Sequence, residues 1–127
     1  MKITDIDFKE LFRNVEERAW YGGENSERYI TDGNNLLFIE GYTYEPSYES
    51  FSATHRIVLN GETLFGINSQ NVEAYHNEEY TFGKLKSDDE AIEYIKNIFG
   101  EKEISISNDD PTKKQEQDDE EDEEEDF

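Results

Sequence analysis

The chain has 127 residues, and its 33 aspartates and glutamates against 12 lysines and arginines give a formal net charge of −21 and an isoelectric point near 4.2. This length predicts one domain, and the absence of cysteine excludes a disulfide framework, a thiolate zinc site and a cysteine nucleophile. The sequence has no basic region followed by about 7–15 apolar residues, as in a secretory signal, and no apolar run near the ~18 residues of a membrane span. We therefore expect a cytoplasmic protein with no membrane partner.

The negative charge has two separate parts. Residues 109–127 hold 12 acidic and 2 basic side chains, whereas residues 1–108 hold 21 acidic and 10 basic ones. The run from Asp118 to Asp126 has no apolar periodicity and repels itself, so it cannot bury enough surface to offset the entropy of ordering. We predict a single globular domain over residues 1–107 and a disordered acidic tail over residues 108–127.

The first predicted element is an amphipathic helix between Asp7 and Ala19. Its apolar side chains recur at helical spacing, with charged residues between them: Phe8, Leu11, Phe12, Val15 and Ala19. Asp7 followed by Glu10 resembles a capping box, and Gly22-Gly23 are expected to end the helix. One apolar stripe of the helix would then face the rest of the domain.

The next segments alternate apolar and polar residues, which is typical of strands with one buried face. Four strands are expected, over residues 28–30, 37–44, 51–59 and 63–67. Asp32-Gly33 predicts the turn between the first two strands. Asn60-Gly61 predicts a type I′ turn between the last two, because these residues tolerate the positive φ that both central positions need.

A further hairpin, a helix and a short strand are predicted in the last part of the domain. The hairpin pairs Val72–Tyr75 with Tyr80–Phe82 around a polar turn at His76-Asn77-Glu78. Ser87 and Glu90 form a capping-box signal for the helix. The apolar stripe of this helix is Ala91, Ile95, Ile98 and Phe99, and Gly100 is expected to end it. The short strand follows at Ile104–Ile106. The element order predicts an α+β fold in which the N-terminal helix and this second helix pack on one face of an antiparallel sheet of four or five strands.

The sequence gives little indication of catalysis. Its two histidines are the only candidates for a base, and neither lies near a recognisable nucleophile or a metal-ligand motif. His55 falls on the apolar face of its strand and is interpreted as a hydrogen-bonded core residue. His76 falls in the predicted polar turn and is expected to face solvent. We predict a protein that is not an enzyme and that holds no metal or cofactor.

The acidity favours a basic partner. Binding to phosphate draws its affinity from lysine and arginine, so a chain this negative is unsuited to nonspecific contact with DNA or anionic membranes. Carboxylates three or four residues apart on a helix lie about 5–6 Å from one another and can imitate backbone phosphates. Two patches are predicted to bind the partner. The first lies near the end of the first helix and includes aromatic residues: Glu16, Glu17, Trp20, Tyr21, Glu24 and Glu27. The second lies at the start of the second helix: Asp88, Asp89, Glu90 and Glu93.

In size, charge and element order the chain resembles some anti-CRISPR and anti-restriction proteins of phages and mobile elements, which are small acidic α+β domains. That resemblance implies an inhibitor that occupies the basic groove of a DNA- or RNA-binding protein. Toxin immunity proteins share the same acidic, motif-poor profile, so binding to another kind of protein partner remains an open alternative.

A different hypothesis comes from the end of the chain. The acidic run closed by Asp126 and Phe127 resembles the C-terminal tips of bacterial single-stranded DNA-binding proteins, which dock on replication partners, although it lacks the proline before the final phenylalanine. That resemblance implies a small single-stranded DNA-binding or replication accessory protein. Bases would then stack on aromatic residues beside cations, and the candidate residues are Arg28, Tyr42, Tyr44, Tyr48 and Arg56.

Overall fold

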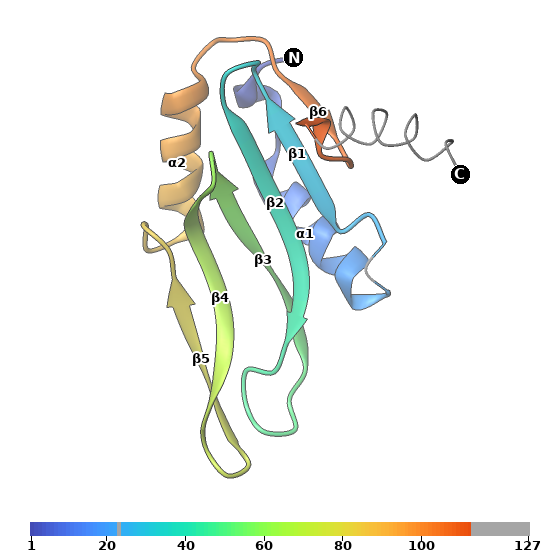
Figure 1. Ribbon diagram of the computed structural model, residues 1–127, viewed down its shortest axis with the longest axis vertical. Coiled ribbons are helices and arrows are strands. Elements are labelled where there is room, and N and C mark those ends of the chain that lie inside the picture. Colours follow the sequence, from blue (N-terminus) through green and yellow to red (C-terminus); the bar gives the residue numbers. More distant parts are fainter. Residues whose placement is uncertain (23, 113–127) are drawn as a thin grey trace, which may run out of the picture.

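The computed structural model describes residues 1–22 and 24–112, which form an α+β fold (Figure 1). Two helices, α1 (Phe8–Trp20) and α2 (Asp88–Phe99), accompany a six-stranded sheet, and a short 3-10 helix, η1 (Ile3–Asp5), precedes α1. The strands are β1 (Glu27–Thr31), β2 (Leu36–Tyr44), β3 (Ser52–Leu59), β4 (Glu62–Glu73), β5 (His76–Phe82) and β6 (Ser105–Ser107). They lie in the order β5-β4-β3-β2-β1-β6, and every neighbouring pair is antiparallel.

Helix α1 begins where the sequence predicts. The Asp7 carboxylate caps it by accepting a hydrogen bond from the backbone N–H of Glu10 (3.2 Å). The buried side chains of the helix, which packs against β2 and β3, are Phe8, Phe12 and Val15. Gly41 of β2 permits this close approach, because a Cβ at that position would lie 2.1 Å from the carbonyl oxygen of Val15.

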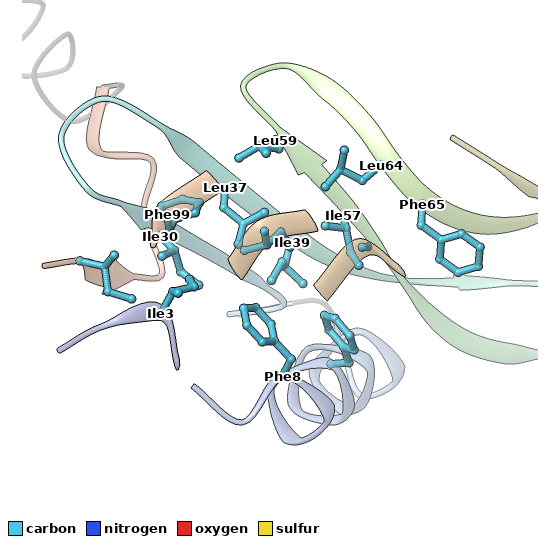
Figure 2. Close-up of a cluster of buried hydrophobic side chains, with 14 of the residues drawn as sticks. Ile3, Phe8, Ile30, Leu37, Ile39, Ile57, Leu59, Leu64, Phe65 and Phe99 are labelled. Carbon is cyan, nitrogen blue, oxygen red and sulfur yellow. The ribbon is translucent and has the colours of Figure 1, made fainter. Parts of the chain in front are cut away.

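One hydrophobic core lies between the sheet and both helices (Figure 2). The strand register pairs Leu37 with Leu59 and Ile39 with Ile57, so these four side chains share one face of the sheet. Ile95 of α2 is fully buried in the same cluster, together with side chains of α1. Both helices therefore pack on one face, as predicted, and we call the opposite side the open face.

The local signals for turns and caps are confirmed. Gly33 has a φ of 98°, and Asn60-Gly61 has positive φ at both positions, 52° and 84°, as a type I′ turn requires. The Ser87 hydroxyl accepts a hydrogen bond from the backbone N–H of Glu90 (3.2 Å) at the start of α2, which ends at Gly100.

The sheet differs from the prediction in two ways. It has six strands rather than four or five, because the segments that form β5 and β6 both join it. The β4–β5 turn lies at Ala74-Tyr75, so His76, Asn77 and Glu78 belong to β5 rather than to a polar turn. Tyr75 adopts a φ of 62°, which is more typical of glycine. Neither Ala74 nor Tyr75 is a residue that favours turns, so the sequence carries no turn signal there. A register shift between Asn71 and Glu73 also interrupts the alternation.

The predicted tail reaches beyond the described chain. Residues 108–112 are described, whereas residues 113–127, most of the predicted tail, are not. Within the described part, no helix combines the length and the apolar composition that crossing a membrane requires.

Candidate binding surfaces

The acidic residues predicted on the first helix lie beside exposed aromatic side chains. Glu16, Glu17, Trp20 and Tyr21 line an open hollow of about 280 Å³ together with Arg13 and Ala53. Glu24 is exposed in the loop after α1, and Glu27 begins β1, where its carboxylate accepts a hydrogen bond from the Tyr29 hydroxyl (3.4 Å). The helical part of this predicted patch is therefore one continuous surface.

Two connections between strands carry further exposed aromatic rings. Phe51 packs on Trp20 with ring centroids 5.4 Å apart, and Tyr48 of the same β2–β3 loop meets Tyr75 of the β4–β5 turn at 5.5 Å. The exposed fractions are 47% for Trp20, 79% for Tyr21, 52% for Tyr48, 56% for Phe51 and 75% for Tyr75. We call these five residues the aromatic surface. Trp20 and Tyr21 were predicted to bind the partner, and Tyr48 was predicted to stack on bases. Phe51 and Tyr75 were not predicted as site residues.

The predicted patch at the start of α2 is partly used within the fold. Asp89 forms an ion pair with Lys9 of α1 at 3.0 Å, and Glu90 accepts a hydrogen bond from the backbone N–H of Lys86 at 3.0 Å. Glu93 has an exposed side chain. Because Asp88, Asp89 and Glu90 all have partners within the chain, this patch leaves less charge free than the sequence pattern indicates.

His55 connects the two predicted acidic patches. Its ring is 5% exposed and stacks on Phe12 with centroids 4.0 Å apart. Nδ1 lies 2.7 Å from Glu16 Oε2 on α1, and Nε2 lies 2.8 Å from Asp88 Oδ1 on α2. Burial alone would lower the pKa of His55, but the hydrogen bonds with Asp88 and Glu16 outweigh burial and raise that pKa above 6.5. The prediction of a hydrogen-bonded core histidine is confirmed, and the residue cross-links α1, β3 and α2.

The residues predicted to contact bases do not form one stripe. They are Arg28, Tyr42, Tyr44, Tyr48 and Arg56. Tyr42, Tyr44 and Arg56 lie on the open face, whereas Tyr48 belongs to the aromatic surface described above. Arg28 is the register partner of the core residue Ile39 and therefore lies on the face that the helices cover.

The cation on the open face is already paired. Nη2 of Arg56 lies 2.7 Å from Glu40 Oε1, and the two residues line a hollow of about 200 Å³ with Tyr42, Asn68 and Phe82. A strand of nucleic acid stacked there would bring its phosphates toward a guanidinium that Glu40 has neutralised.

The hydroxyl groups of the two open-face tyrosines tie the β2–β3 hairpin to the β4–β5 hairpin. Tyr42 donates to the carbonyl oxygen of Ile67, and Tyr44 donates to Glu79 Oε2 at 2.6 Å. Burial, followed by the contact with Glu79, raises the pKa of Tyr44 to about 12. These tyrosines therefore serve the packing of the hairpins.

The ends of two hairpins carry acidic residues that the sequence did not predict as a binding site. Between Tyr29 and Gly83 the single lysine or arginine is Arg56. The β2–β3 and β4–β5 hairpins, which extend past the helices in Figure 1, carry five glutamates at their far ends. We call these residues the acidic hairpin ends: Glu45, Glu49, Glu73, Glu78 and Glu79. The long interval without lysine or arginine was the signal that could have identified them.

His76 and the tail residues Asp126 and Phe127 are the remaining residues singled out by the sequence. His76 begins β5, and its half-exposed ring lies 3.6 Å from Glu78, in agreement with the prediction that it faces solvent. Over residues 1–22 and 24–112, no three histidines or carboxylates are grouped so that they could hold a metal ion. Asp126 and Phe127, the predicted anchor of the tail, lie outside the described residues.

No protein-family model matches the chain, and no curated protein or solved structure is significantly similar to it.

Proposed function

We propose that the protein is a noncatalytic acidic inhibitor, acting in the cytoplasm, that binds a basic nucleic-acid-binding protein and imitates nucleic acid in its groove, as anti-CRISPR and anti-restriction proteins do. The observation that carries this proposal is the charge of the segment between Tyr29 and Gly83, which forms most of the sheet. Arg56 is the one lysine or arginine between Tyr29 and Gly83, and Glu40 neutralises it. A surface of one sign attracts a partner of the opposite sign over long range and accelerates their encounter.

The position of the acidic hairpin ends suits this role. They extend past the helices, so a groove in a partner protein could receive them without a clash with α1 or α2 (Figure 1). Tyr48 and Tyr75, which meet at 5.5 Å, hold the two hairpin ends together.

The state of His55 also supports a noncatalytic role. Both ring nitrogens are engaged by carboxylates, on Glu16 and Asp88, and the ring is buried against Phe12. A general base needs a free nitrogen within hydrogen-bond reach of a substrate. His55 has no nitrogen free for that purpose.

A single-stranded DNA-binding protein is the second candidate, because Tyr42 and Phe82 line the hollow on the open face. Its cations are poorly arranged for phosphate binding. Arg56 is paired with Glu40, and Arg28 lies on the other side of the sheet. The first proposal therefore has the stronger support.

Fluorescence of Trp20 separates the two candidates, since it is the single tryptophan and is 47% exposed. The full chain is titrated with an oligolysine peptide and with oligothymidine, each at low and at physiological ionic strength. The proposal predicts saturable binding of oligolysine that weakens as salt rises. Saturable binding of oligothymidine without binding of oligolysine would contradict it and favour the second candidate.

A further inference from the structure

We propose that the aromatic surface formed by Trp20, Tyr21, Tyr48, Phe51 and Tyr75 is a docking site for arginine side chains of the partner protein. This inference rests on the proposed function, and it adds which residues supply affinity and which basic side chain they select. The acidic hairpin ends would attract the partner, and the aromatic surface would hold it.

The exposure of these rings is the first argument. Each of the five is between 47% and 79% exposed. Large exposed apolar patches are uncommon on monomeric proteins and mark interaction sites, and tryptophan and tyrosine are frequent among the residues that dominate binding energy. Trp20 contacts Phe51, and Tyr48 contacts Tyr75, so the rings are already ordered by one another. Binding would then cost little side-chain entropy.

The β2–β3 loop links the two pairs of rings. Tyr48 and Phe51 are three residues apart in this loop, and they reach the β4–β5 turn and the end of α1 respectively. Tyr75, on the β4–β5 turn, has a φ of 62°. The β2–β3 loop therefore contributes one ring to each of two aromatic pairs, whose other members come from α1 and from the β4–β5 turn.

The surrounding charge identifies the occupant. Glu16 and Glu17 line the hollow beside Trp20. Glu45 and Glu49 belong to the β2–β3 loop, and Glu73 is the last residue of β4, before the turn that carries Tyr75. Arg13 is the cation that lines the same hollow. The net charge of −21 opposes a second copy of this chain as the occupant, because carboxylates of both copies would meet. A cationic partner surface is complementary to this composition.

Arginine fits the surface better than lysine. The planar guanidinium can stack on an aromatic ring while its N–H groups contact a carboxylate, whereas the lysine ammonium acts as a compact, strongly hydrated point charge. Within the chain, an arginine pairs with a glutamate beside aromatic residues. Arg56 contacts Glu40 at 2.7 Å in a hollow lined by Tyr42 and Phe82.

The test uses oligoarginine and oligolysine peptides of equal length, with affinities measured by calorimetry. The full-length chain is compared with Phe51→Ala and Tyr75→Ala, two substitutions at exposed positions. Tyr80→Ala is the matched control, because Tyr80 is also exposed, at 39%. It lies on β5, five residues after Tyr75, which corresponds to about 17 Å of extended chain. Far-UV circular dichroism verifies that each variant is folded.

The natural sequence and Tyr80→Ala should bind oligoarginine about tenfold more tightly than oligolysine, and each surface variant should lose most of that preference. Equal binding of the two peptides, or a preference that survives Phe51→Ala and Tyr75→Ala, would overturn the inference but leave the acidic inhibitor in place. Binding of neither peptide would contradict the proposed function itself. A dimer in sedimentation that both surface variants dissociate would identify a second copy as the occupant and also overturn the inference.

Discussion

The bridge between Glu16, His55 and Asp88 makes a prediction about stability and pH. Because the carboxylates raise the pKa of His55 above 6.5, the folded protein binds more protons than the unfolded chain between 6.5 and the raised value. The free energy of unfolding therefore falls as pH rises through that window. The part of the bridge's contribution that depends on protonation is complete below pH 6.5 and is lost above the folded pKa. Replacement of His55 should accordingly cost more stability in mild acid than in mild base.

The structure sets the size of this difference. A protonated imidazole donates to both carboxylates, whereas a neutral one has a single N–H and can donate to only one of them. Hydrogen bonds to charged groups contribute about 1.5–3 kcal/mol each. Glu16 and Asp88 keep 30% and 26% of their side-chain surface exposed, so water replaces part of each bond. We expect His55→Ala to cost about 3 kcal/mol below pH 6.5 and about 1.5 kcal/mol less above the folded pKa.

Urea unfolding is followed by circular dichroism at several values of pH between 5.5 and 8.5 and at constant salt. It measures the stability lost in His55→Ala at each pH and therefore the change of that loss with pH. The cavity left by His55→Ala does not depend on pH, so it cancels in the difference between the two ends of the range. His76→Gln, which alters the other histidine at an exposed position, should keep the pH slope of the natural sequence. A cost of His55→Ala that is constant or larger at high pH would refute the reasoning.

Three further substitutions test the packing and the turns, each by urea unfolding. Gly41→Ala would place a methyl group 2.1 Å from the carbonyl oxygen of Val15, so α1 must shift and stability should fall by at least about 1–3 kcal/mol; an unchanged midpoint would contradict the close approach. Ser87→Ala removes the cap of α2 and should cost about 1 kcal/mol, whereas no change would show that water replaces the hydroxyl. Asn60→Ala loses the contact with the backbone N–H of Leu36 (2.8 Å) and has to adopt a φ of 52°, so about 1–2 kcal/mol is expected, and a smaller loss would weaken the type I′ assignment.

The fold was predictable wherever one local signal acted alone. Asp7 and Ser87 cap the helices, and Asn60-Gly61 forms the turn that its sequence requires. The β4–β5 turn was not predictable, because Ala74-Tyr75 contains neither glycine nor asparagine and depends on pairing across the whole hairpin. A strand pattern interrupted by a register shift cannot be followed by alternation alone.

The candidate surfaces were only partly predictable for a similar reason. Glu16, Glu17 and Trp20 lie on α1 and Tyr21 follows its last residue, so their spacing alone puts them on one surface. Phe51 joins that surface through its contact with Trp20, and Tyr75 meets Tyr48 of the same β2–β3 loop; no local spacing encodes these contacts.

Arg28 and Arg56 lie on opposite faces of the sheet, and the sequence could not predict this for a comparable reason. The face of each arginine depends on the register between β1, β2 and β3. A shift of one residue in that register would reverse the face on which each arginine lies.

A competition assay tests the central claim most directly. Fluorescence anisotropy follows a labelled duplex bound to a purified basic-groove enzyme, taken from a panel of restriction enzymes and CRISPR effectors, while the full chain is added. A matched variant carries glutamine at each of the acidic hairpin ends: Glu45, Glu49, Glu73, Glu78 and Glu79. We predict that the natural sequence releases the duplex from at least one enzyme, less effectively as salt rises, and that the glutamine variant does not. A duplex that stays bound throughout the panel, or equal release by the variant, would contradict the account.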